Sequence, residues 1–431
     1  MHQNLRKWLR LVAVMVSGWV ILSHVATAPA QPATAATPNE GIICTTSANS
    51  TFTLTTQTGY IGTPDDNTVF MWGYSAGNDG FQHPSPVLCV NEGDTVTIIL
   101  RNTLDQDVSI LFPGQEDVTA NGALAQPQFD GSGALTSLTN VAPKNGGSVT
   151  YRFTADKPGT FIYQSGTNPE IQVRMGLFGV LIVRPAQGAD YAYNRTDTQF
   201  KSSTEFMVLL SEIDPYLNQA VQRGRTFNMN NYRPRYWLVN GRGYPDTIAP
   251  NFASWLPTQP YGALARINPY HPTQNPQPGL VRYINVGTDE FPFHPHGNNG
   301  RVVGRDGHVL ENAAQEDLSF EKFAINIGPG QTWDVLFRWY DAQSYANANG
   351  DTVPVQIPVL QNLVVGMFYG GSPYLGEQGT LPVGSTSVNE CGEYYIISHN
   401  HALYQITSWG VPMTGPITYL RIDPPLPNNC P

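Results

Sequence analysis

The sequence predicts an all-β protein made of two β-sandwich domains, and three observations support this fold class. Apolar and β-branched residues alternate with polar ones in short runs along most of the chain, which is typical of strands with one buried face. Glycine and proline are abundant, at 41 and 35 residues, and they bound many of these runs as turns. The length of 431 residues suits two to three domains.

The first domain is predicted over residues 44–186 and the second over residues 205–431, with a polar linker at 187–204. Four alternating runs mark strands of the first domain: Ser50–Thr56, Thr95–Leu100, Ser148–Phe153 and Leu177–Val183. The second domain opens with Glu205–Ser211 and closes with Ile417–Ile422. We expect antiparallel strands in both domains and no long helix, because no stretch has sustained helical periodicity.

Residues 214–280 stand apart from this pattern because they are rich in Pro, Asn, Tyr and Arg. The segment is longer than an ordinary loop between strands. We therefore interpret it as an insertion that covers a domain face or a surface between subunits.

The first 30 residues have the layout of a secretory signal peptide. Three basic residues precede an apolar run, Leu11–Leu22, and two A-x-A cleavage sites follow it at 26–28 and 28–30. The alternative is an uncleaved anchor, but the run is short for a span of about 20 residues. We expect residues 31–43 to form a flexible leader and the protein to be exported, either secreted or periplasmic.

Charge and cysteine content narrow the function classes. The formal net charge is −10, and it falls to −13 without the three basic residues of the signal peptide. Such a balance argues against nucleic-acid binding, which needs a basic face. The four cysteines allow three disulfide pairings. We favour Cys44–Cys89 and Cys391–Cys430 for an exported protein over free buried thiols.

Several phrases, in this order along the chain, resemble the multicopper oxidases: VNEGDTVTIILRN, KPGTFIYQSG, GLFGVLIVRP, YWLVNGRGYP, VRYINVG, FPFHPHGNNGRVVGRDG and INIGPGQTWDVLFRW. The match spans nearly all of the chain after the leader. The resemblance implies two cupredoxin-like Greek-key sandwiches, in the two-domain arrangement of the family. It also implies a homotrimer, in which the first domain of one subunit faces the second domain of the next.

The first domain departs from the family at its copper ligands. Family members contribute two His-x-His pairs from this domain to a trinuclear copper cluster. Leu111-Phe112-Pro113 stands in the place of the first pair and Gln164-Ser165-Gly166 in the place of the second. Because none of these side chains replaces imidazole, we expect no metal in the first domain.

The second domain has lost the blue-copper ligands that the resemblance implies. Phe291 stands in the place of one ligating histidine, Asn400 in the place of the cysteine and Gln405 in the place of the later histidine. A blue-copper centre needs a thiolate and two imidazoles. The cluster histidines of this domain, His294 with His296 and His399 with His401, are retained.

These four histidines predict a metal site even without the resemblance. Alternate side chains of a strand share a face, so His294 and His296 point the same way, as do His399 and His401. If the two strands are neighbours, four imidazoles meet. All-nitrogen ligation suits copper, with zinc or nickel as alternatives. The competing interpretation is that the histidines are relics of a lost cluster.

Other candidate residues receive ordinary structural roles. Histidine ligands usually need a hydrogen-bond partner, and Asp289, Glu290, Asn400 and Gln405 are near enough in sequence to serve. We expect His308 on the surface and the proline-flanked His83 and His271 in loops. Core or strand packing is expected for the remaining candidates, which are Tyr394, Tyr395, Tyr404, Met175 and Met413.

The sequence therefore supports three functions. The first is a copper-dependent oxidoreductase with one mononuclear site at His294, His296, His399 and His401, for which no catalytic residue or substrate can be named. It would not be a laccase-type enzyme, because half of the cluster and the blue-copper centre are missing. The second is capture or storage of copper or zinc. The third is a metal-free structural or adhesive protein on a degenerate cupredoxin scaffold.

Overall fold

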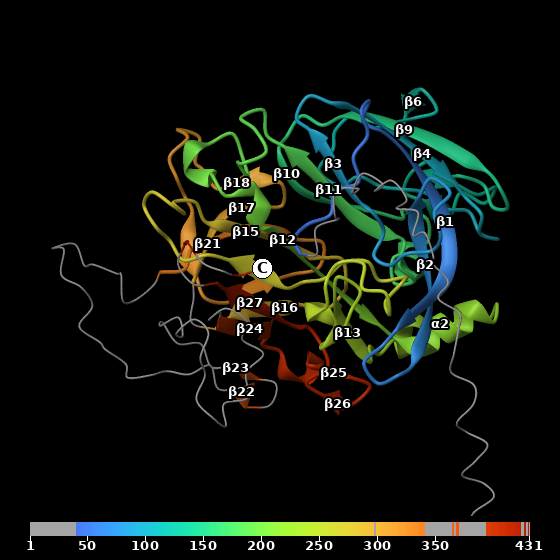
Figure 1. Cartoon of the computed structure of the whole chain (residues 1–431). Coiled ribbons are helices and arrows are strands. Elements are labelled where there is room, and N and C mark those ends of the chain that lie inside the picture. The colour runs from blue at the N-terminus through green and yellow to red at the C-terminus, as the bar shows by residue number, and fades with distance from the viewer. Residues whose placement is uncertain are drawn as a thin grey trace, which may run out of the picture. The chain divides into compact units, whose positions relative to one another are not determined.

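A computed structural model describes residues 40–296, 299–340, 364–365, 368–369, 394–423, 426–427 and 430, and this part of the chain consists mainly of strands (Figure 1). Residues 38–431 form one compact unit. The predicted signal peptide and Cys391 lie outside the described residues. Within them, no helix is long and apolar enough to cross a membrane.

Residues 51–184 build the first sandwich, from two sheets and a small hairpin. The larger sheet has the order β2 (Thr68–Ala76), β1 (Thr51–Gly62), β4 (Thr95–Arg101), β9 (Ser148–Thr154), β5 (Thr119–Ala120) and β6 (Ala123–Leu124). The smaller sheet has the order β10 (Gly159–Gln164), β11 (Phe178–Arg184) and β3 (Val87–Asn91). The hairpin pairs β7 (Gln128–Phe129) with β8 (Leu135–Ser137).

Residues 205–422 build the second sandwich. One sheet has the order β18 (His308–Val309), β17 (Gly300–Arg305), β21 (Thr332–Phe337), β15 (Gly279–Asn285), β12 (Glu205–Ile213), β13 (Tyr236–Val239), β25 (Thr407–Ser408) and β26 (Val411–Pro412), and β19 (Phe320–Lys322) pairs with β17. The other has the order β14 (Ala265–Ile267), β27 (Ile417–Ile422), β24 (Tyr394–Asn400), β16 (Phe291–Pro295) and β20 (Ile325–Ile327). A separate pair joins β22 (Val364–Val365) to β23 (Phe368–Tyr369).

Helices are short and few among the described residues. They are α1 (Pro169–Gln172), α2 (Pro215–Gln222) and 3₁₀ turns at Thr196–Thr198, Ser202–Thr204, Met229–Asn231, Asp246–Ile248 and Leu403–Gln405. The all-β class is confirmed. The expectation of antiparallel strands holds only in part, because β1–β4, β3–β11, β12–β15 and β14–β27 are parallel pairs. Alternation reports a buried face and carries no information on the direction of the neighbouring strand.

The segment 214–280 is more regular than an inserted loop. It begins with α2, which Asp214 caps by accepting a hydrogen bond from the Tyr216 amide, and it contributes β13 and β14 to the sheets. It also covers the edge of the first sandwich. Asn218 donates to the Phe70 carbonyl, and the Gln259 side chain accepts from the Gly62 amide.

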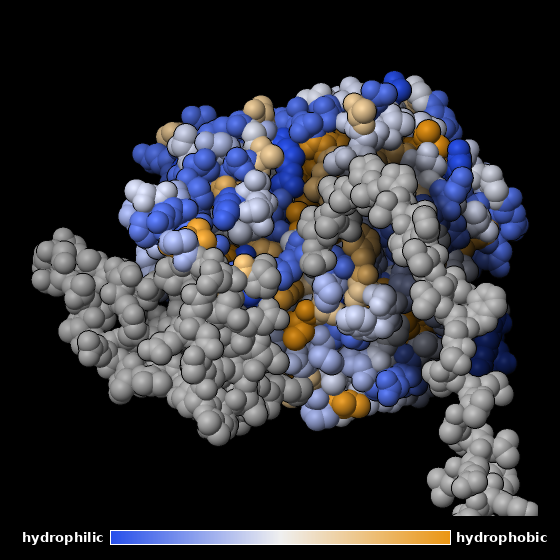
Figure 2. All heavy atoms as spheres, viewed as in Figure 1, coloured by the Kyte–Doolittle hydropathy of each residue, from blue (hydrophilic) through white to orange (hydrophobic). Residues whose placement is uncertain are grey.

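An apolar cluster crosses the junction between the two sandwiches. Val87, Ile162 and Val180 of the smaller first sheet pack in the same cluster as Leu209 and Ile284 of β12 and β15. The predicted Cys44–Cys89 disulfide is confirmed, and it ties the start of the described chain to β3 beside this cluster. On the face drawn in Figure 2, hydrophilic residues predominate and apolar ones are scattered among them, as on most folded surfaces.

A buried ionic network lies at the same junction. The guanidinium of Arg282 is fully buried and pairs with Glu205 at 2.6 Å and with Asp334 at 3.1 Å. From the first sandwich, Arg184 binds both oxygens of Glu205, and the Thr160 hydroxyl donates to Asp334. Burial alone would raise the pKa of Glu205, but the charges of Arg282 and Arg184 hold this pKa below its ordinary value. The carboxylate therefore stays ionised and links the two sandwiches.

We predict that Glu205→Ala lowers the free energy of unfolding by about 3–5 kcal/mol, because it leaves the buried Arg282 charge without one of its two carboxylates. Urea unfolding followed by tryptophan fluorescence measures the change. The control is Glu116→Ala, which removes an exposed partner of Lys157 and should leave the unfolding midpoint unchanged. Equal effects of the two substitutions would contradict a special role for the buried network.

Candidate metal centre

Two adjacent strands carry the predicted histidines. The strands β16 and β24 are antiparallel neighbours, and His294 lies directly opposite His399. Pairing continues past both strand ends, because the His296 amide donates to Ile397 and the His401 amide donates to Pro292. The alternation of side chains along each strand then directs all four imidazoles to the same side of the sheet.

The four rings converge. The His294 ring centroid lies 4.9 Å from the centroids of His296, His399 and His401. The Nε2 atoms of His296 and His399 are 3.0 Å apart. Ring nitrogens of His294, His296 and His399 all lie within 4.8 Å of one another, while His401 stacks on His399 at 5.6 Å outside this group of three.

His294 is the most buried member, at 6% exposure, and neither of its ring nitrogens has a hydrogen-bond partner among the described residues. The centroid of its ring lies 5.0 Å from the centroid of the Phe323 ring. Burial, together with His399, His296 and His401, lowers the pKa of His294 to about 4. The ring is therefore neutral at physiological pH, and its lone pair is available to a metal ion.

His399 is oriented by the backbone. Its Nδ1 lies 2.8 Å from the Asn400 carbonyl, which accepts the Nδ1 proton and leaves the Nε2 lone pair facing His296. Burial is the main cause of the lowered pKa of both His399 and His296. These neutral, converging imidazoles fit a divalent metal ion of the transition series.

The side chains predicted to support the histidines bond elsewhere. Asp289 accepts from the Trp237 indole at 2.8 Å, and Glu290 accepts from Asn326. Asn400 donates to Gln405, which in turn donates to the Glu290 carbonyl. In the part of the chain that the structure describes, none of the four side chains is bonded to a histidine ring. The prediction of side-chain support was wrong because a backbone carbonyl orients His399 instead.

The position of the implied blue-copper centre is filled. Phe291, Asn400 and Gln405 are each fully buried, and their space is occupied by a phenyl ring and two amides that bond to one another. Uncharged amides are weak ligands for copper beside thiolate or imidazole. This pocket therefore has the composition of a packed polar core.

In the first sandwich, the two places of the lost histidine pairs do lie together. Leu111 and Gln164 form a β-bridge, with reciprocal N···O distances of 2.7 and 3.1 Å. Phe112 packs into the core, and the Ser165 hydroxyl donates to Gln172. Among the described residues of this sandwich, no three His, Cys, Asp or Glu side chains converge in a group that could hold a metal ion.

Most of the remaining predictions agree with the structure. His308 is exposed, and His271 sits in a loop where its Nδ1 accepts from the Gln274 amide. Met175 lies in the first core, Met413 packs against a core cluster of the second sandwich, and Tyr395 does likewise. Tyr404 is instead 66% exposed, with its ring edge against Trp237, and the Tyr394 side chain lies outside the described residues.

His83 and Glu212 are buried ionisable residues that were not anticipated from the sequence. His83 lies in a loop, as expected, but it is fully buried, and burial lowers its pKa to about 3. Glu212 is also buried, and this burial raises its pKa to about 7 despite hydrogen bonds from Thr288. Its second oxygen has no partner. Neither residue stands in a recognisable motif, so local sequence gave no signal.

Comparison with known proteins identifies similar chains. The family model for "Multicopper oxidase" matches residues 67–188. The chain is 25% identical to Laccase-12 of Arabidopsis thaliana, over 59% of this chain and 38% of that protein. It is 27% identical to an L-ascorbate oxidase of Brassica rapa subsp. pekinensis, over 59% of this chain and 42% of that protein. The chain thus spans well under half the length of these relatives.

Solved structures share the fold. A multicopper oxidase, mgLAC, superposes with a TM-score of 0.56 at 18% identity, covering 86% of both chains. A blue copper oxidase from Nitrosomonas europaea superposes with a TM-score of 0.55 at 17% identity, covering 87% of this chain and 85% of the other. The cupredoxin-like architecture expected from the sequence is confirmed.

We predict that Glu212 makes stability depend on pH. Its pKa is about 7 in the folded chain against an ordinary value of 4.5, so the folded state holds the proton more tightly. The contribution of this group to stability is therefore fully present below pH 4.5 and is lost as pH rises through 7, by about 3 kcal/mol. Glu212→Gln should remove that loss, as measured by urea unfolding from pH 5 to 8.

The matched control for this measurement is Glu170→Gln, which removes an exposed carboxylate from the first sandwich. It should reproduce the pH profile of the unmodified protein. A Glu212→Gln profile that runs parallel to the unmodified one would show that this carboxyl does not titrate differently on unfolding.

Proposed function

We propose that this chain, which belongs to the multicopper oxidase family, is an exported protein that binds one copper ion through His294, His296 and His399, with His401 as a fourth ligand. The observation that carries the proposal is the bare His294 ring at the centre of the cluster. Leaving two ring nitrogens buried without partners is unfavourable, and metal ligation removes that cost for one of them.

Copper is the proposed metal because the family is a copper family and all-imidazole ligation suits it. When bound, copper would supply one-electron redox chemistry. The chain's own contribution is to hold His399 in one tautomer through the Asn400 carbonyl and to keep His294 neutral through burial. Phe323 shields one side of the His294 ring from water.

Laccase-type reduction of oxygen is not proposed for this chain. That chemistry in the family uses ligands from both domains and a separate electron-entry centre. Leu111 and Gln164 stand where the first domain would supply cluster ligands. Phe291, Asn400 and Gln405 stand where the electron-entry centre would bind its copper. A mononuclear copper-dependent oxidoreductase is the enzymatic form of the proposal, and copper capture without turnover is the other form.

A structural or adhesive role is the second candidate, and exposed aromatic residues on the segment 214–280 favour it. Tyr216 is 54% exposed, Phe252 49% and Trp255 62%. Such side chains are enriched where proteins contact one another. This role does not need the histidine cluster, so metal analysis separates it from the first candidate.

We predict that purified protein carries about one copper ion per chain and that the double substitution His294→Ala and His399→Ala abolishes binding. The two residues face each other across β16 and β24, so the pair removes half of the imidazoles. Native mass spectrometry and elemental analysis give the stoichiometry after equilibration with copper and, separately, zinc. The control is His308→Ala, an exposed histidine that lies outside the cluster. Unchanged stoichiometry in the double variant would defeat the proposal.

Copper-loaded protein should lack an intense blue absorption. The intense band near 600 nm of blue-copper proteins comes from a cysteine thiolate bound to copper. At that position stands Asn400, which is buried and bonded to Gln405. Visible spectroscopy should show weak ligand-field absorption only. An intense band would place a thiolate at the metal, and Asn400→Cys tests whether restoring the thiolate alone creates one.

We also propose a homotrimer whose assembly does not depend on metal. Phe112 is not available for a contact between subunits, because its ring is buried against Tyr151 and Phe153. Beside the lost ligand positions, the β7–β8 hairpin instead exposes Phe129 at 62% and Leu135 at 54%. Burying each such side chain between subunits would contribute roughly 1.5–3 kcal/mol to the free energy of association.

Light scattering before and after chelation tests both parts of this claim. A trimer should persist without metal and should weaken when Phe129 and Leu135 are both replaced by Ser. A monomer under all conditions excludes the trimer, whereas dissociation on chelation would mean that the metal bridges subunits.

A further inference from the structure

A large cavity adjoins the histidine cluster. It has a volume of about 850 Å³, and its walls include Asp197, Arg301, Glu321, Phe323, Arg338 and Tyr340. Phe323 belongs to both places, because its ring lines the cavity and contacts the His294 ring at 5.0 Å. A molecule in this cavity would therefore be separated from the proposed copper site by one aromatic side chain.

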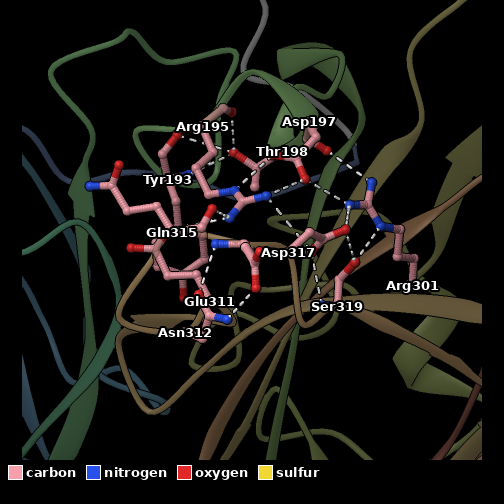
Figure 3. Close-up of polar contacts among 11 residues, drawn as sticks. Tyr193, Arg195, Asp197, Thr198, Arg301, Glu311, Asn312, Gln315, Asp317 and Ser319 are labelled. Atoms are coloured by element: carbon pink, nitrogen blue, oxygen red, sulfur yellow. Dashed lines mark hydrogen bonds and ion pairs between the residues drawn. The ribbon is translucent and has the colours of Figure 1, made fainter.

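One of the two cationic side chains in this wall is already neutralised. Arg301 pairs with Asp197 at 2.9 Å and with Asp317 at 3.0 Å, and it also donates to the Ser319 hydroxyl (Figure 3). Asp197 is held in addition by Arg195. The positive and negative charges in this part of the wall nearly balance. Arg301 is therefore a weak binding partner for a negatively charged ligand.

The second cation, Arg338, is held in place, and in the described part of the chain it has no counter-ion. Its guanidinium lies over the Tyr270 ring at 4.8 Å, and one nitrogen donates to the Pro276 carbonyl at 3.1 Å. Its Nε atom is buried without a hydrogen-bond partner. Among the described residues, no carboxylate lies within ion-pair distance of Arg338. A positioned guanidinium of this kind is suited to binding a carboxylate through two hydrogen bonds.

The other side chains of the wall determine the shape and charge of the ligand that fits the cavity. Phe323 is 57% exposed and Tyr340 is 45% exposed, so each presents an aromatic surface beside the charge. Glu321 is exposed at the same cavity and repels a second negative group. The complement to this wall is a flat apolar molecule with one carboxylate.

We propose that this cavity binds a small aromatic monocarboxylate, with its carboxylate on Arg338 and its ring against Phe323. The inference deepens the proposed function, since it names the ligand class beside the copper site. The binding itself requires no metal, because Arg338 and the aromatic wall supply the contacts.

Calorimetric titration of the full-length, chelator-treated protein with benzoate tests the proposal. We expect saturable binding of one benzoate per chain and affinity at least about ten-fold weaker in Arg338→Gln. Arg225→Gln, at an exposed arginine outside the cavity, should bind benzoate like the unmodified protein. Glu321→Gln should keep benzoate binding and should newly accept terephthalate, a dicarboxylate.

Absence of saturable benzoate binding, or an Arg338→Gln variant that binds normally, overturns the inference. If Arg338→Gln fails to fold by circular dichroism, Thr196→Trp provides the second variant, because the exposed Thr196 lines the cavity and a bulky ring there should block benzoate. Copper stoichiometry measured on the same preparations keeps the two proposals apart. Copper binding without benzoate binding refutes the cavity assignment alone, and the reverse result refutes the copper site alone.

Discussion

The arrangement of the two sandwiches depends on the ion pairs that the buried guanidinium of Arg282 makes with two carboxylates. Arg282 lies on β15, at the centre of the second sandwich's larger sheet, and reaches Glu205 on β12 and Asp334 on β21. Through Arg184 and Thr160 the same carboxylates are bound to the first sandwich. An apolar junction alone is tolerant of sliding, whereas directional charge-assisted hydrogen bonds admit one alignment. The network therefore adds geometric definition to the apolar contact around it.

The candidate metal centre depends on a second constraint, which is strand register. Because His294 is opposite His399, the neighbouring histidines two residues along each chain fall within reach of the same volume. A slip of one residue would turn one pair of rings to the other face of the sheet. The same register places Phe293 opposite Asn400, on the face that packs as core. One set of backbone hydrogen bonds thus defines both the metal centre and the filled pocket behind it.

The fold class, the main strands and the histidine cluster could be predicted from the sequence. The alternating runs identified the strands that open and close each sandwich, and the two His-x-His pairs identified rings that do converge. The parallel partners of β1 and β12 could not be predicted, because strand direction is decided by distant segments. The burial of His83 and Glu212 was missed for a related reason, since each is enclosed by residues remote in sequence.

The pairing of β16 with β24 also has a consequence for the order of events as the chain is made. His296 and His399 are 103 residues apart, so half of the imidazoles are absent until residues 399–401 have been synthesised. The opposing strand, β24, is held on its other side by β27, which follows it in the sequence. Closing so long a loop is slow and comes after local structure has formed. The candidate metal centre therefore forms only after most strands of both sandwiches have been made, and a chain that stops before β24 lacks half of its imidazoles.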